Sequence, residues 1–410
     1  MYSGNSLFSH LLHRCGLNYS NCAFSLTNNS LAFMMRRFER IYDVVEPVEE
    51  YRLGGYHPVH LHDVFHQRYE VIGKLAYGQH STVWLAKDQQ PGLQQVVLKI
   101  LKAEASENNR ELSILLTLSD SGMGHPGKRH VIELLDYFYH TGPNGTHLCL
   151  IFPVMISDGE GMTICGNTHE AGYIRAISRQ ILLGLNFLHQ LDIVHCELQP
   201  ANILFSISGT TNMEELVQPP EFSPVKWLEG VTEDDSAPKY LVPTQRRRGQ
   251  LDSRHFSTIE VRIGDLGGAQ YINHRNQQPV TPLALRAPEL IRRHTEDTAI
   301  DDTIDIWTLG CLLFELATNE PLFPLDTFGL ARDVIDNNHC SLIDQRLDSN
   351  SLRNEKFRGH LRDRLPDNFG AENVEALASF LLLMLRMDPR ERLPARDLLQ
   401  TQFISEGIQH

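Results

Sequence analysis

Two hydrophobic patterns divide the chain. Between Tyr69 and Pro153, short runs rich in β-branched and aromatic residues recur at 69–75, 82–87, 96–101, 131–139 and 147–153. Between the third and fourth runs, residues 106–118 place Leu112 and Leu115 at helical spacing. The pattern predicts a small antiparallel lobe of strands with one helix.

Beyond Pro153 the spacing becomes mainly helical. Residues 173–189 place isoleucines and leucines on one face. Residues 304–317 are apolar on almost all sides, which indicates a buried helix. A third apolar helix is expected over 374–387, where Asp388 and Pro389 end it. We therefore expect a second, larger and mainly helical lobe.

Two stretches follow neither pattern. Residues 206–258 hold a Pro-Pro pair, an acidic run and the basic run 246–248, so we predict a surface insertion, with the basic run either a solvated loop or a nuclear address. Residues 1–38 contain no Asp or Glu and are rich in Ser and Asn, which fits a disordered tail or a mitochondrial transit peptide. The predicted units are an N-terminal extension (1–45), a first lobe (46–155) and a second lobe (156–405).

Composition narrows the partners. The net charge of −14 argues against direct binding to nucleic acid and suits a basic peptide, although acidity also serves solubility alone. The seven cysteines include no C-x-x-C pair, which favours free thiols over disulfides or a zinc site. No apolar run is long enough to cross a bilayer, so no membrane partner is expected.

The first candidate for chemistry is the loop at 193–205, I-V-H-C-E-L-Q-P-A-N-I-L-F. His195, Glu197 and Asn202 have the spacing H-x-[DE]-L-x-x-x-N of a kinase catalytic loop, although a satisfied turn could also contain them. Asp265 follows a predicted strand in I-G-D-L-G-G. It either makes a turn or joins Asn202 in supplying oxygen ligands to magnesium.

The second candidate is the turn at 75–84, L-A-Y-G-Q-H-S-T-V-W. Backbone N–H groups in such a turn can lie over phosphates. Gly78 is its one glycine; Ala76 and Ser81 stand where the kinase pattern G-x-G-x-x-G has its others. The run G-M-G-H-P-G at 122–127 is a closer literal match, but it follows a helix and does not open one, so we interpret it as a decoy.

A lysine ends the run V-V-L-K after this turn. Lys99 is either a surface residue of its strand or the group that pairs the α- and β-phosphates. In the second case Glu111 on the following helix is its expected partner, with Glu107 as the alternative.

Two further motifs decide the class. Residues 287–289 read A-P-E, and residues 305–310 read D-I-W-T-L-G at the start of the buried helix. A buried acid needs a partner, and we expect Arg392 to pair with Glu289. Small-molecule phosphotransferases share a similar catalytic loop but lack these two motifs, which argues against that class.

With these motifs the chain resembles a eukaryotic protein kinase, and in particular the SR-protein kinases of fungi, over roughly residues 45–405. The likeness also rests on E-E-Y-R-L-G-G-Y-H-P-V (49–59), H-S-T-V-W-L-A (80–86), H-T-G-P-N-G-T-H-L-C-L-I-F (140–152) and T-P-L-A-L-R-A-P-E (281–289). It implies an α+β, two-lobed kinase fold and a monomer in the cytoplasm or nucleus.

The resemblance also implies roles for the candidate residues. Glu197 takes the position of the catalytic base, Lys99 and Glu111 form the ion pair, and Asn202 and Asp265 hold Mg²⁺. ATP would be bound by Leu75, Ala76, Tyr77, Gly78, Val83, Lys99, Phe152, Val154, Met155 and Leu204. The implied reaction is transfer of the ATP γ-phosphate to Ser or Thr of Arg/Ser-rich proteins involved in mRNA processing.

Three departures from the family pattern leave an alternative open. Glu197 replaces an aspartate, Gln199 a lysine, and Cys196 the arginine that in many kinases grips a phosphorylated activation loop. The first two, together with Ala76, support a pseudokinase scaffold that binds ATP with little turnover, whereas retention of Lys99, Asn202 and Asp265 favours the enzyme. The third predicts that phosphorylation of Thr281 does not switch the protein on.

Overall fold

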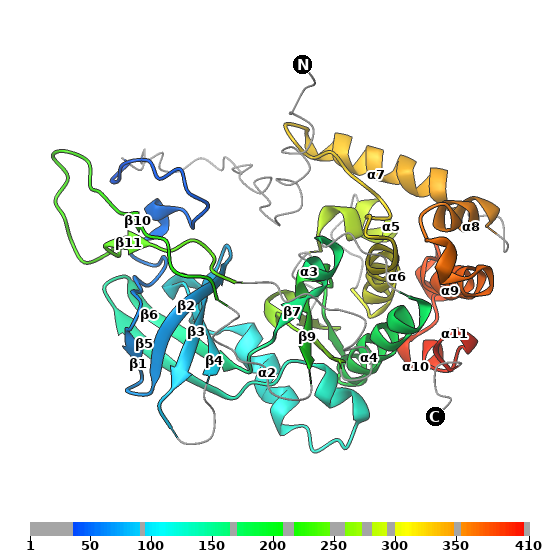
Figure 1. Cartoon of the computed structure of the whole chain (residues 1–410), viewed down its shortest axis with the longest axis horizontal. Coiled ribbons are helices and arrows are strands. Elements are labelled where there is room, and N and C mark those ends of the chain that lie inside the picture. Colours follow the sequence, from blue (N-terminus) through cyan, green and yellow to red (C-terminus); the bar gives the residue numbers. More distant parts are fainter. Residues whose placement is uncertain are drawn as a thin grey trace.

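The computed structural model describes residues 36–90, 95–164, 170–207, 217–246, 259–272, 281–292, 300–347 and 354–405. They form two lobes, one built on a β-sheet and one mainly helical (Figure 1). The residues of the predicted N-terminal extension before 36 lie outside the described ranges.

The first lobe is a six-stranded antiparallel sheet in the order β1-β2-β3-β4-β6-β5, with helix α2 beside it. Its elements are β1 (Val64–Phe65), β2 (Tyr69–Tyr77), β3 (Ser81–Asp88), β4 (Gln95–Leu101), α2 (Arg110–Asp120), β5 (Asp136–Gly142) and β6 (Gly145–Phe152). The predicted order of strands and helix is confirmed.

Two predicted boundaries in this lobe are wrong. The fourth run begins its strand at Asp136, because Val131 and Ile132 instead bond to Ile263 of the other lobe: Val131 forms a bridge with it, and the Ile132 N–H donates to its carbonyl at 2.8 Å. The helix begins at Arg110 rather than Ser106, since the Asn109 side chain caps it by accepting from the Leu112 N–H at 2.9 Å.

The second lobe is mainly helical. Its helices are α3 (Gly159–Ile164), α4 (Ala171–Gln190), α5 (Pro288–Ile291), α6 (Thr303–Thr318), α7 (Arg332–Arg346), α8 (Glu355–Arg362), α9 (Ala371–Met384), α10 (Ala395–Leu398) and α11 (Gln402–Ser405). The three predicted helices appear as α4, α6 and α9, with α9 displaced toward the N-terminus by about one turn from the expected 374–387. The more polar helices α7 and α8 were not predicted.

Short strands link the lobes and carry the catalytic loop. Strands β12 (Ile259–Ile263), β9 (Ile203–Ile207) and β7 (Ser157–Asp158) form one small sheet, and β13 (Gln270–Tyr271) pairs with β8 (Ile193–Val194). The catalytic loop therefore runs between β8 and β9, with both ends held by backbone pairing.

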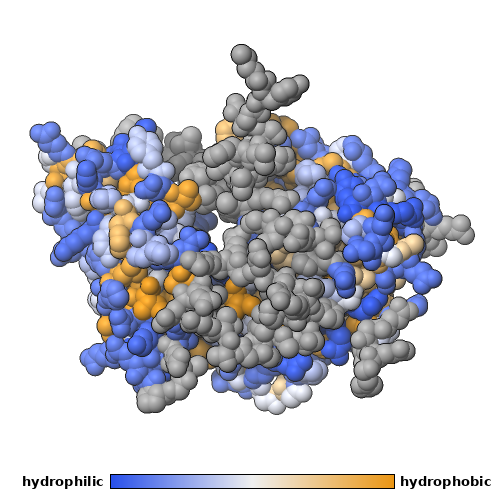
Figure 2. Space-filling model, viewed as in Figure 1, coloured by the Kyte–Doolittle hydropathy of each residue, from blue (hydrophilic) through white to orange (hydrophobic). Residues whose placement is uncertain are grey.

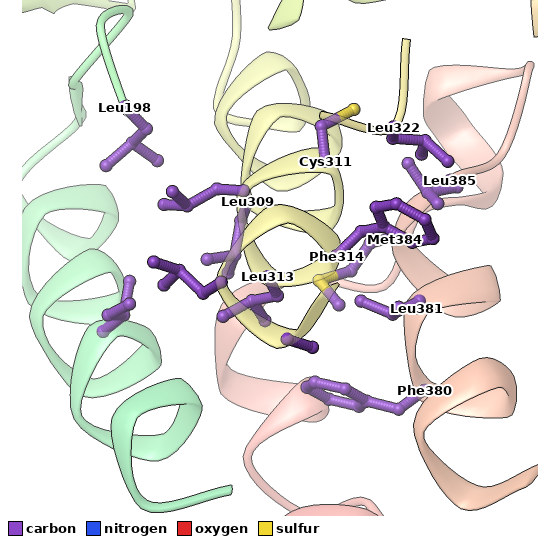
Figure 3. Close-up of a cluster of buried hydrophobic side chains, with 14 of the residues drawn as sticks. Leu198, Leu309, Cys311, Leu313, Phe314, Leu322, Phe380, Leu381, Met384 and Leu385 are labelled. Carbon is purple, nitrogen blue, oxygen red and sulfur yellow. The ribbon is translucent and has the colours of Figure 1, made fainter. Parts of the chain in front are cut away.

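Helix α6 forms the centre of the large core. Its Leu309, Leu313 and Phe314 pack with Met384 and other residues of α9 (Figure 3). Leu198 of the catalytic loop is fully buried in the same cluster. Burial of a leucine contributes about 2 kcal/mol, so the core fixes the loop as well as the helices.

The described part of the predicted insertion packs against the sheet lobe. Its short strands β10 (Ser223–Pro224) and β11 (Tyr240–Leu241) form a hairpin beside the first described residues of the chain (Figure 1). Phe38 lies 4.4 Å from Trp227 between ring centroids. Leu241 is buried with Tyr51 and Tyr56 in a separate small core.

Charged and polar residues cover most of the visible described surface, with a group of hydrophobic residues in the lower part of the sheet lobe (Figure 2). None of the helices in the described ranges combines the length and hydrophobicity needed to span a bilayer.

Candidate active site

A lysine and two carboxylates meet where the lobes face each other. Lys99 on β4 places its Nζ 2.7 Å from Oε1 of Glu111 on α2 and 2.9 Å from Oδ1 of Asp265 after β12. The structure therefore selects Glu111 over Glu107 as the partner of Lys99. It also shows that the predicted lysine and the predicted metal ligand converge.

The three charged side chains shift one another's pKa values. Burial opposes the charge on Lys99, but the Asp265 and Glu111 carboxylates raise its pKa, so it stays protonated. Lys99 in turn lowers the pKa of Asp265, the most exposed member, with 45% of its side chain accessible. Burial raises the pKa of Glu111 against the pull of Lys99.

Backbone bonds to a buried carboxylate hold the catalytic loop. Asp305 in the first turn of α6 accepts from the His195 N–H at 2.7 Å and from the Cys196 N–H at 2.9 Å. Cys196 has a left-handed backbone (φ 64°), so the chain turns sharply here. This contact explains the acid that the sequence places in an otherwise apolar helix, because each buried Asp305 oxygen receives a partner.

Glu197 follows this turn and is half-buried. Burial and the nearby Asp265 carboxylate raise its pKa to about 7, although Lys99 acts in the opposite direction. Gln199 donates its amide N–H to Oε1 of Glu197 at 3.3 Å. A carboxylate that titrates near neutrality suits proton transfer at physiological pH.

Asn202 and Asp265 flank Glu197. Asn202 is buried and donates its side-chain N–H to the backbone carbonyl of Glu197 at 2.9 Å. The backbone carbonyl of Asn202 accepts from the Gly264 N–H at 2.8 Å. The residue before Asp265 is thus bonded directly to Asn202. An amide and an exposed carboxylate offer the oxygen donors that Mg²⁺ prefers, and phosphates and water normally complete its shell, so these residues fit the ion.

Three of the hydrophobic residues predicted to bind ATP, Phe152, Met155 and Leu204, come together, and Val97 lies with them. Phe152 at the end of β6 is buried in the core under α2, and Val97, Met155 and Leu204 pack against the same cluster. Val97 pairs directly with Phe152 across β4 and β6. Leu204 packs closely against Gly264: a Cβ added to Gly264 would lie 2.5 Å from the Leu204 side chain. The remaining predicted position in this segment, Val154, is partly buried.

The predicted phosphate loop joins β2 to β3. Val83 is the cross-strand partner of both Ala76 and Lys99, which places the loop beside the lysine. Leu75, Ala76 and Tyr77 are partly buried within β2, and Gly78 at the tip is exposed. The glycine-rich run at 122–127 follows α2 and leads into a short 3-10 helix (Pro126–His130) that packs against α4.

Glu289 of the A-P-E motif forms the predicted ion pair with Arg392. Arg392, whose side chain is fully buried, makes two hydrogen bonds to Glu289, at 2.6 and 2.7 Å.

Cys196 stands where many kinases have an arginine. Buried Thr281 donates its hydroxyl to the Cys196 carbonyl at 2.7 Å. Burial raises the pKa of the Cys196 thiol, so the residue at the arginine position carries no charge.

Other contacts between distant segments were not predicted. Glu46 forms a fully buried ion pair with Lys74 of β2 and accepts a hydrogen bond from the Tyr51 hydroxyl. Arg246, in the basic run of the insertion, bonds to buried Asp158 at 2.8 Å, so this arginine makes a tertiary contact; residues 247 and 248 lie outside the described ranges. Of these residues, only Tyr51 lies in a motif on which the family resemblance rests, at 49–59. That motif did not indicate which residues Tyr51 contacts.

Comparison with known proteins follows from this geometry. The model of the family "Protein kinase domain" matches residues 69–216 and 251–404. The chain belongs to the protein kinase family. A solved kinase-domain crystal structure that covers 85% of this kinase, and 99% of its own chain, gives a TM-score of 0.57 at 18% identity. The two-lobed fold predicted from the sequence is thereby confirmed.

Similar curated proteins define the type of kinase. This kinase is 32% identical to "Serine/threonine-protein kinase SRPK" of Physarum polycephalum over 88% of its own length and 91% of that protein. It is 26% identical to "Protein kinase dsk1" of Schizosaccharomyces pombe over 90% of its own length and 86% of that protein. The predicted resemblance to SR-protein kinases is confirmed.

Proposed function

We propose that the protein is an active serine/threonine protein kinase that transfers the ATP γ-phosphate to Arg/Ser-rich proteins, with glutamate at the base position. The observation that supports this most strongly is that the Lys99 Nζ lies within 3 Å of carboxylate oxygens of both Glu111 and Asp265. A scaffold has no need to maintain a largely buried lysine between two carboxylates, since burying charge is costly. Its serine/threonine kinase relatives support the same assignment.

Each residue has a task in the proposed reaction. Glu111 orients the Lys99 ammonium, which aligns the α- and β-phosphates of ATP. Asn202 and Asp265 would hold Mg²⁺, which supplies neutralisation of phosphate charge when bound. Glu197 accepts a hydrogen bond from the substrate hydroxyl and takes its proton as the oxygen attacks the γ-phosphorus, and ADP leaves. The phosphate loop and the cluster around Phe152 bind the nucleotide.

The two departures in the loop are compatible with activity in this proposal. Glu197 extends one methylene beyond an aspartate, and Gln199 bonds to it directly, which limits its rotamers. The proposal therefore favours the enzyme over the scaffold.

The substrate class rests on charge and on relatives. A net charge of −14 attracts arginine-rich segments and repels nucleic acid. A kinase named SRPK matches most of the chain. We place the protein in the cytoplasm or nucleus and treat it as a monomer on the same resemblance. Cell fractionation and light scattering would test these two statements.

The experiment is a comparison of peptide substrates. Purified full-length protein with ATP and Mg²⁺ should phosphorylate an Arg-Ser repeat peptide much faster than matched Lys-Ser and Glu-Ser repeats. Arginine can form paired hydrogen bonds to carboxylates that lysine cannot, which predicts the first preference. Equal rates on all three peptides would contradict the substrate class, and no transfer to any of them would contradict the kinase activity.

A further inference from the structure

A tyrosine outside the predicted site touches the phosphate loop. The hydroxyl of Tyr56 donates a hydrogen bond to the carbonyl of Gly78, with 2.6 Å between the oxygens. Tyr56 is 2% exposed, whereas Gly78 is exposed at the tip of the loop. A buried group from the segment before the sheet thus holds an exposed residue of the loop.

The backbone of Tyr56 is itself fixed on several sides. The Tyr56 N–H donates to the Glu50 carbonyl at 3.0 Å, and Asn144 donates its amide to the Tyr56 carbonyl at 2.6 Å. Gly55 before it has no room for a side chain, because a Cβ would lie 1.9 Å from the Glu50 carbonyl oxygen. This close approach explains the second glycine of the motif at 49–59. The two backbone hydrogen bonds and this close packing fix the position of Tyr56.

A lysine links the ring to the other side of the loop. Lys102 places its Nζ 4.4 Å from the centre of the Tyr56 ring and 2.7 Å from Glu50. Its backbone N–H donates to the His80 carbonyl at 2.8 Å. The turn is also closed internally, since the Gly78 N–H donates to the Ser81 carbonyl at 2.8 Å. The loop is therefore held at Gly78 and at His80 by one connected group of residues.

We infer that Tyr56 is a positioning residue for ATP, which holds the phosphate loop in its binding conformation through the Gly78 carbonyl. The inference rests on the proposed function, because it assigns nucleotide binding to this loop. Burial raises the pKa of Tyr56, so the phenol remains a donor. Ala76 and Ser81 already limit the freedom that glycines would give this loop, and the hydrogen bond limits it further at the one glycine that remains.

Two matched variants test the inference. Tyr56→Phe removes only the hydroxyl that reaches Gly78. Tyr51→Phe removes a hydroxyl of the same buried cluster, which bonds to Glu46 at 2.6 Å and does not touch the loop. We expect Tyr56→Phe to raise KM for ATP about 5-fold, the effect of one ordinary hydrogen bond, with kcat little changed because ground state and transition state lose the contact equally.

Hydrogen exchange gives a readout that does not depend on catalysis. In the nucleotide-free protein, Tyr56→Phe should accelerate amide exchange at residues 76–82 about 5-fold for the same reason, and Tyr51→Phe should leave that segment unchanged. Wild-type exchange and KM in Tyr56→Phe, or equal acceleration by both variants, would overturn the inference. A wild-type protein without phosphate transfer would instead contradict the proposed function, and the exchange experiment would still decide the role of Tyr56.

Discussion

At the scale of single residues, the site depends on where charge is buried. Lys99 stays charged because two carboxylates surround it, whereas Glu197 becomes easier to protonate because burial and Asp265 oppose its charge. The same carboxylate, Asp265, raises both pKa values: it stabilises the charged form of Lys99 and destabilises the charged form of Glu197. These shifts have consequences that enzyme kinetics can measure.

The pKa of Glu197 predicts the pH dependence of the reaction. A base must be deprotonated to act, and its pKa of about 7 lies above that of an ordinary glutamate. We expect kcat/KM to be constant above neutrality and to fall about tenfold for each pH unit below it. An Arg-Ser peptide is suitable because arginine does not titrate in this range. A rate that is unchanged between about pH 5.5 and about pH 8 would contradict the role of Glu197 as base.

Thr281 gives a prediction about regulation. Its hydroxyl is buried against the Cys196 carbonyl, and no arginine stands at position 196 to receive a phosphate. Treatment with a phosphatase should therefore leave activity intact. Thr281→Glu should lower the free energy of unfolding by more than about 2 kcal/mol, because it buries an unpaired charge, without raising kcat. Loss of activity on dephosphorylation would show that the prediction is wrong.

At the scale of elements, strong periodicity was the best guide. The strands around Lys99 and helices α4, α6 and α9 follow from their hydrophobic spacing, and the catalytic residues follow from motifs between them. Helices α7 and α8 were missed because they lie at the surface and are more polar. The start of β5 was misjudged because Val131 and Ile132 are hydrophobic for another reason, contact with the second lobe.

The insertion was harder to predict because its contacts are individual and distant. The side-chain oxygen of Gln245 accepts from the backbone N–H of Lys74 at 2.9 Å, and the backbone N–H of Gln245 donates to the Lys74 carbonyl at 2.9 Å. The two residues are 171 positions apart in the sequence. The next residue, Arg246, bonds to Asp158 at the start of the second lobe. Neither contact requires a repeating spacing of hydrophobic residues, so neither produces a pattern in the sequence from which it could be predicted. Together they join β2 to β7 through the insertion.

This link between the lobes predicts a loss of stability when it is broken. Asp158 is 2% exposed, and Arg246→Ala would leave its carboxylate without the guanidinium. We expect the free energy of unfolding to fall by about 2 kcal/mol. The matched control is Arg332→Ala, which removes an exposed pair with Asp336 on α7 and should cost less than about 1 kcal/mol. Urea denaturation measures both, and equal losses would argue against the link.

At the scale of the whole molecule, charge is the feature that bears on substrates. With a net charge of −14, the protein should attract an arginine-rich peptide over distances comparable to the Debye length, about 10 Å at 0.1 M salt. KM for an Arg-Ser peptide should therefore rise severalfold between about 0.05 and about 0.3 M salt, while KM for ATP changes less. A peptide KM that does not respond to salt would show that charge does not select the substrate.

The central claim is that this kinase fold is catalytically competent with glutamate at the base position. The most direct test is transfer of radiolabelled phosphate from ATP to an Arg-Ser repeat peptide with Mg²⁺, for the wild type, Asp265→Ala and Glu197→Asp. We predict transfer by the wild type that disappears in Asp265→Ala. No transfer by the wild type, with clear activity in Glu197→Asp, would contradict the claim and identify Glu197 as the substitution that disables the site.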